Sequence, residues 1–440
     1  MDRFRVERRE LLRLAAPLAG QQVGFQLMGL VDALVLGRYS DAALAGAGIG
    51  NNLLFAIVSV GLGIVMGMDT VVPQALGGGR TEDARRAVGA GIRLAVMVGL
   101  AATLLVMASP FVLDVAGVEH DVVAEARPYV FVRALGIVPF LITIAQRSYL
   151  AAHGRTRPLI VATIAGNAVN AVLDIALVFG VSAIGLPRLG VIGAAAATAA
   201  VQIVTAVIFG LAVRELNAHA PAPRSTRADL AKIVRFGWPV GAQIFAEVGI
   251  FGIATVAAGR LGKVPAAAHS IALNLASFTF SAAFGLASAT SVRVGHAIGA
   301  GDRALARHRG VQGMRYALAI MAVAATTFLV AGHALASAFT ADTAVVAATV
   351  PLLHIAALFQ LSDGAQALGA GALRGLGDTH ATLVGNLIGH YAIGLPIMLG
   401  LAFGASLGAP GLWWGLSVGL TVTAVYLVAR FLAGTRATRV

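Results

Sequence analysis

Four carboxylates stand inside long apolar runs of this sequence, where acidic side chains are rare. Asp32, Asp174, Glu247 and Asp363 each have runs of mostly aliphatic residues on both sides. A charged side chain at the centre of a membrane-spanning helix costs roughly 2.5–3.5 kcal/mol to insert. A structural role, such as pairing with Arg133, is the alternative for any one acid. Four acids with almost no Arg or Lys at matching depth favour a proton or cation site.

The first two acids fall at one depth, together with two neutral polar residues. At about 1.5 Å per helical residue, Asp32 and Asp174 lie roughly 8–10 Å from the outer ends of their runs. Asn170 lies one turn deeper than Asp174 on the same helix face. Thr198 lies about 12 Å from the outer end of the next run. We therefore expect these four side chains to converge in the N-terminal half.

The other two acids lie deeper in their runs. Glu247 and Asp363 are each about 15 Å from their cytoplasmic ends, near the midplane of the second half. A carboxylate so placed can exchange H⁺ against Na⁺ or a cationic substrate, and oxygen ligands suit hard cations. Glu247 and Asp363 are therefore a candidate proton or Na⁺ site.

The composition is that of a polytopic helical membrane protein. Of the 440 residues, 58% are hydrophobic and 12% are charged, and the mean hydropathy is +0.85. Soluble domains carry about 25% charged residues. Apolar runs of roughly 20 residues, each long enough to cross a bilayer, recur throughout. The predicted spans are 14–37, 43–68, 89–112, 128–150, 159–181, 190–213, 236–259, 265–290, 312–335, 346–373, 381–404 and 410–432.

The charge distribution predicts the orientation. With twelve spans, both termini share one side with every second loop, and that side holds 26 of the 32 Lys and Arg residues. Basic loops remain in the cytoplasm, so both termini are predicted to be cytoplasmic. The net charge of +12 is therefore a topology signal, and nucleic-acid binding is not expected.

The two halves of the chain repeat one another. At a shift of 222 residues Pro17 falls on Pro239 and Gln21 on Gln243. Six spans in each half make the repeat parallel, an arrangement in which transporters hold substrate between the halves and alternate access. The predicted domains are an N-terminal six-helix bundle, a cytoplasmic linker and a C-terminal six-helix bundle, at 1–213, 214–235 and 236–440.

The acids do not follow the repeat. Asp363 has Phe140 as its counterpart, and Glu247 has Phe25. Asp32 likewise falls on Ala254. The scaffold was duplicated, whereas the charge was placed separately in each half.

Other residues are weaker candidates. Pro17 and Pro239, near the starts of their spans, can bend a helix, although a proline near a helix start is often harmless. Trp413 is predicted to lie in an interfacial belt. No Walker motif or H-E-x-x-H is present, so no enzymatic activity is expected. The candidate substrate-cavity residues are Gln21, Gln243, Phe280, Phe359 and Tyr391.

The sequence resembles the multidrug and toxic compound extrusion (MATE) family, NorM-type branch. The resemblance covers essentially the whole chain and is most specific over His269–Arg307 and Asp363–Thr379. Glu247 and Asp363 look like the paired acids of that branch's C-terminal cation site, and Phe280 like a family aromatic near them. Phe359 stands where the branch often has Tyr, so one hydroxyl ligand is lacking. The group Asp32, Asn170, Asp174 and Thr198 is similar to the family's N-terminal proton or sodium site.

The resemblance implies an all-α fold of twelve transmembrane helices in two six-helix bundles. It implies a secondary exporter of amphiphilic organic cations, driven by inward H⁺ or Na⁺ and needing no cofactor. The expected partners are small cationic compounds and membrane lipids, with the protein a monomer in the plasma (inner) membrane. A lipid-linked precursor flippase is the alternative, but its cavity would favour Arg and Lys over acids.

Overall fold

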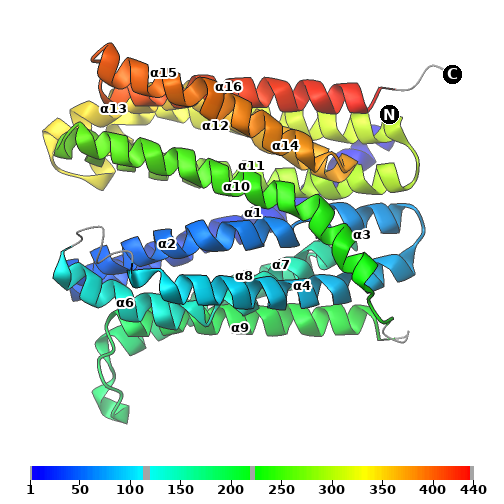
Figure 1. Cartoon of the computed structure of the whole chain (residues 1–440), viewed down its shortest axis with the longest axis horizontal. Coiled ribbons are helices and arrows are strands. Elements are labelled where there is room, and N and C mark those ends of the chain that lie inside the picture. The colour runs from blue at the N-terminus through cyan, green and yellow to red at the C-terminus, as the bar shows by residue number, and fades with distance from the viewer. Residues whose placement is uncertain (1, 112–118, 219–222, 437–440) are drawn as a thin grey trace. The chain divides into compact units, whose positions relative to one another are not determined.

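A computed structural model describes residues 2–111, 119–218 and 223–436, which are almost entirely helical (Figure 1). One isolated antiparallel bridge joins Val181 and Leu186. The last residue of the predicted span 89–112 and part of the predicted linker 214–235 lie outside the described residues. The helices of the N-terminal half are α1 (Asp2–Tyr39), α2 (Asp41–Val65), α3 (Met68–Gly77), α4 (Thr81–Ala108), α6 (His120–Ala134), α7 (Ile137–Ala152), α8 (Arg157–Phe179), the 3₁₀ turn η1 (Ser182–Ile184) and α9 (Val191–Leu216).

The C-terminal half has longer helices and two π-helical stretches. Its elements are α10 (Arg227–Arg260), α11 (Lys263–Gly299), α12 (Arg303–Phe339), α13 (Thr343–Leu376), α14 (Thr379–Asn386), the π-helix η2 (Leu387–Gly394), α15 (Leu395–Leu399), the π-helix η3 (Gly400–Gly404) and α16 (Ala409–Gly434). Short polar side chains start several helices. The Asp302 carboxylate accepts a hydrogen bond from the Leu305 amide at 2.7 Å at the start of α12, for example.

The helices confirm a polytopic membrane fold. In the described part of the chain, ten helices are long and apolar enough to cross a bilayer, and the bent pair α6–α7 forms one more. The first predicted span lies in α1, where Gln21, Gln22 and Gln26 lower the apolarity. All twelve predicted spans thus fall within helices, apart from the masked end at 112 and short loop residues.

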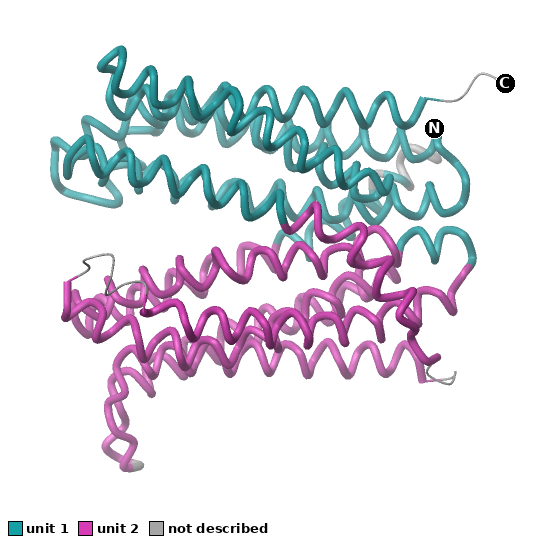
Figure 2. Tube along the Cα trace, in the orientation of Figure 1, with its two compact units in different colours: residues 1–19, 73–79, 242–440 teal, residues 20–72, 80–241 magenta. Residues whose placement is uncertain are grey.

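The chain divides into two compact units (Figure 2). Unit 1 comprises Met1–Ala19, Pro73–Gly79 and Ala242–Val440, and unit 2 comprises Gly20–Val72 and Arg80–Gly241. The units therefore differ from the predicted halves in short segments at the starts of α1 and α10 and in α3. Both helices continue through their prolines, Pro17 and Pro239, and the unit boundaries follow two residues later. That either proline bends its helix stays a prediction.

Hydrogen bonds at two helix ends confirm the repeat. Gly154 and Gly377 both have positive φ, +67° and +89°, as a left-handed helix-ending residue requires. The amide of Arg155 donates to the Leu150 carbonyl at 2.9 Å. The amide of Asp378 donates to the Leu373 carbonyl at 2.9 Å, so the two turns have the same bond. The Gly-rich turn after α13 is therefore a feature of the duplicated scaffold.

Close helix approaches also repeat, one in each unit. A Cβ at Gly285 would lie 2.3 Å from the Ala19 Cα within unit 1, and a Cβ at Gly63 would lie 2.3 Å from the Gly241 Cα within unit 2. Both pairs are related by the shift of 222 residues. Glycine is required at these crossings because any side chain would strike backbone.

A Gly285→Ala protein is therefore expected to be less stable by about 1–3 kcal/mol, the usual effect of overpacking. Thermal unfolding of the purified protein in detergent measures this. Gly29→Ala is the matched control, because a Cβ there meets nothing within 4 Å. An unchanged melting temperature for Gly285→Ala would contradict the described crossing.

The core of unit 1 contradicts the interfacial role expected for Trp413. Its side chain is fully buried, and its ring lies 5.7 Å from that of Phe359 and 5.9 Å from that of His269. The neighbouring Trp414 is exposed. The expectation was wrong for Trp413 because consecutive helical residues face different directions, so only one of two adjacent tryptophans can face lipid.

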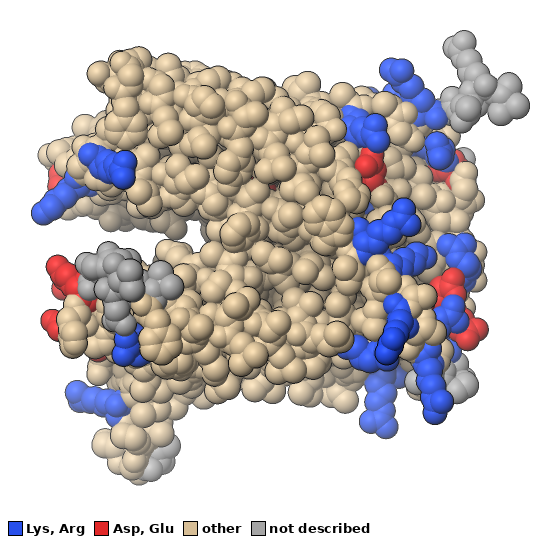
Figure 3. Space-filling view, viewed as in Figure 1, with Lys and Arg blue, Asp and Glu red and all other residues tan. Residues whose placement is uncertain are grey.

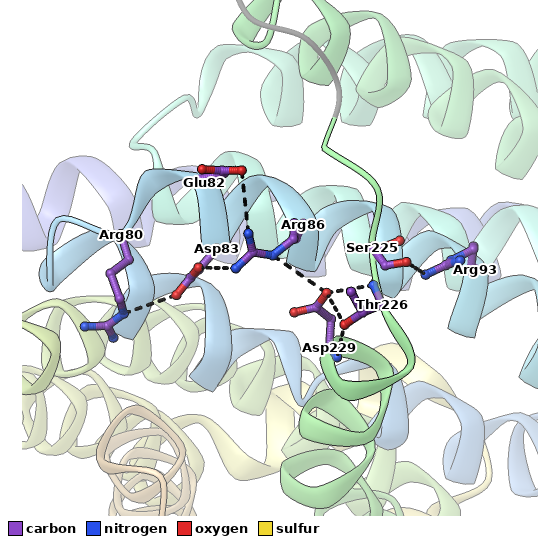
Figure 4. Close-up of polar contacts among 8 residues, drawn as sticks. All are labelled: Arg80, Glu82, Asp83, Arg86, Arg93, Ser225, Thr226 and Asp229. Atoms are coloured by element: carbon purple, nitrogen blue, oxygen red, sulfur yellow. Dashed lines mark hydrogen bonds and ion pairs between the residues drawn. The ribbon is translucent and has the colours of Figure 1, made fainter.

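Lys and Arg side chains gather at one end of the helices in each unit (Figure 3). In unit 2, Asp229 near the start of α10 lies 3.8 Å from Arg86 of α4 and accepts hydrogen bonds from Thr226, while Arg93 donates to the Ser225 carbonyl at 2.6 Å (Figure 4). These contacts fix the start of α10 against α4. The side of the membrane that these ends face stays a prediction.

A buried acid near the start of α1 has the equivalent role in unit 1. Glu7, the counterpart of Asp229 at a shift of 222 residues, accepts two hydrogen bonds from Arg309, each 3.0 Å long, and also contacts Arg293. Burial raises the pKa of the Glu7 carboxyl, but the hydrogen bonds and charges of Arg309 and Arg293 outweigh burial. The pKa of Glu7 is therefore lowered from 4.5.

Because the pKa is lowered on folding, Glu7 stabilises unit 1 above the unfolded-state pKa, and this contribution is lost as the pH falls through the folded-state pKa. Glu7→Gln should cost about 3 kcal/mol at neutral pH, since it leaves two guanidinium groups without their buried acid. It should also make unfolding less sensitive to acid below about pH 4.5. Thermal unfolding across pH tests both effects. Glu10→Gln, whose side chain is 57% exposed, is the control, and equal effects of the two substitutions would contradict the assignment.

Candidate functional site

The first site lies in unit 2, where the structure brings together the four residues expected to converge. Asp32 of α1 accepts hydrogen bonds from Asn170 Nδ2 at 3.1 Å and from Thr198 Oγ1 at 2.9 Å. Asp174 of α8 is fully buried and faces both Asp32 and Asn170. The helices α1, α8 and α9 thus each supply part of one oxygen-rich group.

The surroundings of this group contain a tyrosine and an arginine. Tyr129 of α6 lies within electrostatic range of Asp32 and Asp174 and hydrogen-bonds Arg133. Among the described residues, Arg133 makes no ion pair with Asp32 or Asp174. The two acids therefore have neutral hydrogen-bond donors for partners, as a site that releases and takes up a cation needs. Tyr129 was missed because no spacing in the sequence relates α6 to α8.

A pocket adjoins the first site in the same unit. It holds about 260 Å³ of empty space between α1, α8 and α9. Its polar lining includes the candidate residue Gln21 together with Asn167, Thr163 and Thr205, and its apolar lining includes Met28. These residues lie one to three turns from Asp32, Asn170 and Thr198 along the same helices. The pocket is thus mixed in polarity and has two carboxylates close by.

The second site lies in unit 1, between α10 and α13. Asp363 is 6% exposed and lies within electrostatic range of Glu247. Gln366 Nε2 donates to Glu247 Oε1 at 3.2 Å, and Gln243 also hydrogen-bonds Glu247. The predicted pair is therefore close together, with two amides in attendance. Gln366 was missed, although its position three residues after Asp363 places it on the same helix face.

A cation is present near Glu247 on the chain itself. Arg374, in the last turn of α13, lies within electrostatic range of Glu247. The donor set of two carboxylates and two amide groups is rich in oxygen and suits H⁺ or a hard cation such as Na⁺. The roles of all these residues stay predictions.

The remaining cavity candidates lie in different surroundings. Phe359 is 2% exposed and packs between Trp413 and Phe251, with ring centroids 5.7 and 6.3 Å away. Tyr391 donates from its hydroxyl to the Ala246 carbonyl at 2.7 Å, beside Glu247. Phe280 is half-buried, with its ring centroid 6.0 Å from that of Phe284.

Comparisons with known proteins agree over nearly the whole chain. The MatE family profile matches residues 17–176 and 239–399. A probable multidrug resistance protein NorM of Deinococcus radiodurans is 37% identical, covering 98% of this chain and 97% of its own. The multidrug resistance protein NorM of Burkholderia vietnamiensis is 35% identical, with 95% and 92% covered.

Solved structures share the fold at lower identity. A crystal structure of a Vibrio cholerae MATE transporter has a TM-score of 0.91 and 19% identity, covering 100% of this chain and 99% of its own. A eukaryotic MATE transporter has a TM-score of 0.90 and 22% identity, with 98% of both chains covered. At this identity the likeness supports the fold of twelve helices in two bundles.

Proposed function

We propose, since this chain belongs to the MatE family of membrane transporters, that it is a secondary active multidrug exporter. It exchanges inward H⁺ or Na⁺ for amphiphilic organic cations by alternating access. The observation that carries the proposal is the presence of a buried acid group in each unit, Asp32 with Asp174 and Glu247 with Asp363. The family and the multi-pass helical fold supply the transporter, and the acids supply the coupling.

The chemistry of the acids supports exchange. Two carboxylates close together in an apolar protein repel one another, so one of them readily holds a proton. A cation that reaches the site removes the repulsion and displaces that proton. Because neither pair is neutralised by a direct Arg partner among the described residues, the charge remains available for an ion or a cationic substrate.

The pocket beside Asp32 suits the proposed substrate class. Met28 and Phe25 supply apolar contacts, Gln21 and Asn167 supply hydrogen bonds, and the nearby acids attract positive charge. Relatives at 35–37% identity have names that describe multidrug resistance, which supports export of several compounds rather than one.

The alternative, a flippase for lipid-linked precursors, needs cations to bind the phosphates of its substrate. The polar groups described at the two sites are mainly acids, amides and hydroxyls. The acids favour cationic substrates, so the exporter is the better-supported function. We also propose that the protein lies in the inner membrane with both termini in the cytoplasm.

Dye efflux from cells tests the proposal. Cells that lack their own exporters and express this chain should expel ethidium faster than cells with an empty vector, and an agent that collapses both ion gradients should stop efflux. An anionic dye of similar size is the control substrate. Equal retention of ethidium in both strains, at confirmed expression, would contradict the proposal.

A further inference from the structure

Two polar side chains of unit 1 are fully enclosed without partners. Asn386 ends α14, and His390 lies one turn later in η2; both are 0% exposed. Neither the Asn386 amide atoms nor the two ring nitrogens of His390 have a hydrogen-bond partner among the described residues. The two side chains, four residues apart, carry four unpartnered polar atoms in one region.

Such a cluster requires an explanation. A buried donor or acceptor without a partner costs about 1–3 kcal/mol, and most buried polar groups have one. Four together would be a large loss for a single helix. We therefore expect a small polar ligand at this place.

The local backbone has the form of a built site. The helix changes from α to π at Leu387, and π-helical turns are frequent at functional sites. η2 approaches α16 closely, since a Cβ at Gly389 would lie 2.0 Å from Thr423 Oγ1 and 2.5 Å from the Gly419 carbonyl oxygen. Glycine at 389 thus leaves polar atoms of α16 beside the helix that carries Asn386 and His390.

Printed contacts place His390 in the layer of the acids. The next residue, Tyr391, donates to the carbonyl of Ala246, which precedes Glu247. On the other side, Ser362, which precedes Asp363, hydrogen-bonds Thr421 of α16 at 2.7 Å. Since Gly389 contacts Thr423 and Gly419, these elements share one depth. The His390 site therefore lies level with Glu247 and Asp363.

The nature of the ligand follows from the neighbouring charges. The titratable side chains of α14 and α16 are His380, Tyr426 and Arg430, each at least one turn of helix away toward the opposite helix end from Trp413. Arg430 is paired with Asp378 at 2.7 Å, and α15 has no titratable side chain. On α10 the nearest acid is Glu247, reached through Tyr391. No charge at the site itself selects an ion.

We propose that Asn386 and His390 bind internal water between η2 and α16. Water both donates and accepts, as an amide and a neutral imidazole together require, and buried water usually makes about three hydrogen bonds to such groups. The site is separate from the acids of the proposed function and places water at their depth in unit 1. The proposal does not depend on what the protein transports.

Radiolytic hydroxyl-radical footprinting of the full-length protein, read by mass spectrometry, tests the site. Bound water generates radicals in place, so His390 should be modified although it is buried. Met321 is the internal control, because it is fully buried and its thioether oxidises readily. A radical scavenger in the buffer should reduce modification at His120, which is 98% exposed, and spare His390.

The Asn386→Leu variant should lower His390 modification by about half or more, because it removes half of the polar atoms that hold the water. Modification of His390 in the wild-type protein no faster than that of Met321 would overturn the proposal. So would modification of His390 that the scavenger suppresses as fully as that of His120. Both tests use the wild-type protein, so they remain decisive if the variant fails to fold.

Discussion

An Asp363→Asn protein is expected to reach the membrane at normal levels and to expel ethidium no faster than cells without the transporter. Asparagine keeps the size and hydrogen bonding of the side chain but can neither hold an exchangeable proton nor attract a cation. Glu247 would then stand alone with Gln366 and Gln243, and the displacement of a proton by a cation would lose its pair of acids. The measurement is dye efflux from cells at matched expression.

Asp378→Asn is the matched control for this substitution. Asp378 follows α13 directly, is paired with Arg430 at 2.7 Å and is partly exposed, so its loss should leave efflux within about twofold of the wild type. Normal efflux by the Asp363→Asn protein would show that the buried acid of α13 is not a coupling group.

In unit 2, an Asp32→Asn protein should show an altered pH profile of efflux. Asp32 is the member of the first site that accepts bonds from both Asn170 and Thr198, and Asp174 faces it. Removing its charge changes the electrostatic surroundings of Asp174, and a nearby charge affects titration by about one to three pH units. The pH of half-maximal efflux should therefore change by about one unit or more.

The control for Asp32 is Asp41→Asn, at the exposed start of α2. That substitution should leave the profile unchanged. If Asp32→Asn lowers efflux equally at every pH, or not at all, then Asp32 has a structural role in holding α1 to α8 and α9, and the coupling would rest on the acids of unit 1.

Local sequence patterns were sufficient to predict the helices and the duplicated turns. Apolar runs gave the spans, because a membrane helix must be about 20 residues long. Gly154 and Gly377, aligned by the repeat, both end helices with positive φ. Asp32, Asn170, Asp174 and Thr198 could be grouped because depth in a membrane is measurable along a helix, and depth alone brought them within hydrogen-bonding distance.

Contacts that depend on how helices rotate about their axes could not be predicted. Depth placed Trp413 near a membrane surface, but only packing decides that its ring turns inward. Tyr129 comes to Asp32 through the packing of α6. The inclusion of Glu7 in unit 1, through Arg293 and Arg309, separates α1 between two units. No local pattern around Glu7 indicates which helix its partners occupy.

Purified protein in lipid vesicles, with an imposed pH or Na⁺ gradient and an organic cation dye, tests the central claim most directly. The proposed exchange predicts that one of the two gradients drives the dye against its own concentration difference, and that Asp363→Asn abolishes this movement. Dye movement that is the same with either gradient, with both and with none would contradict coupling, even if cells that express the protein resist the dye.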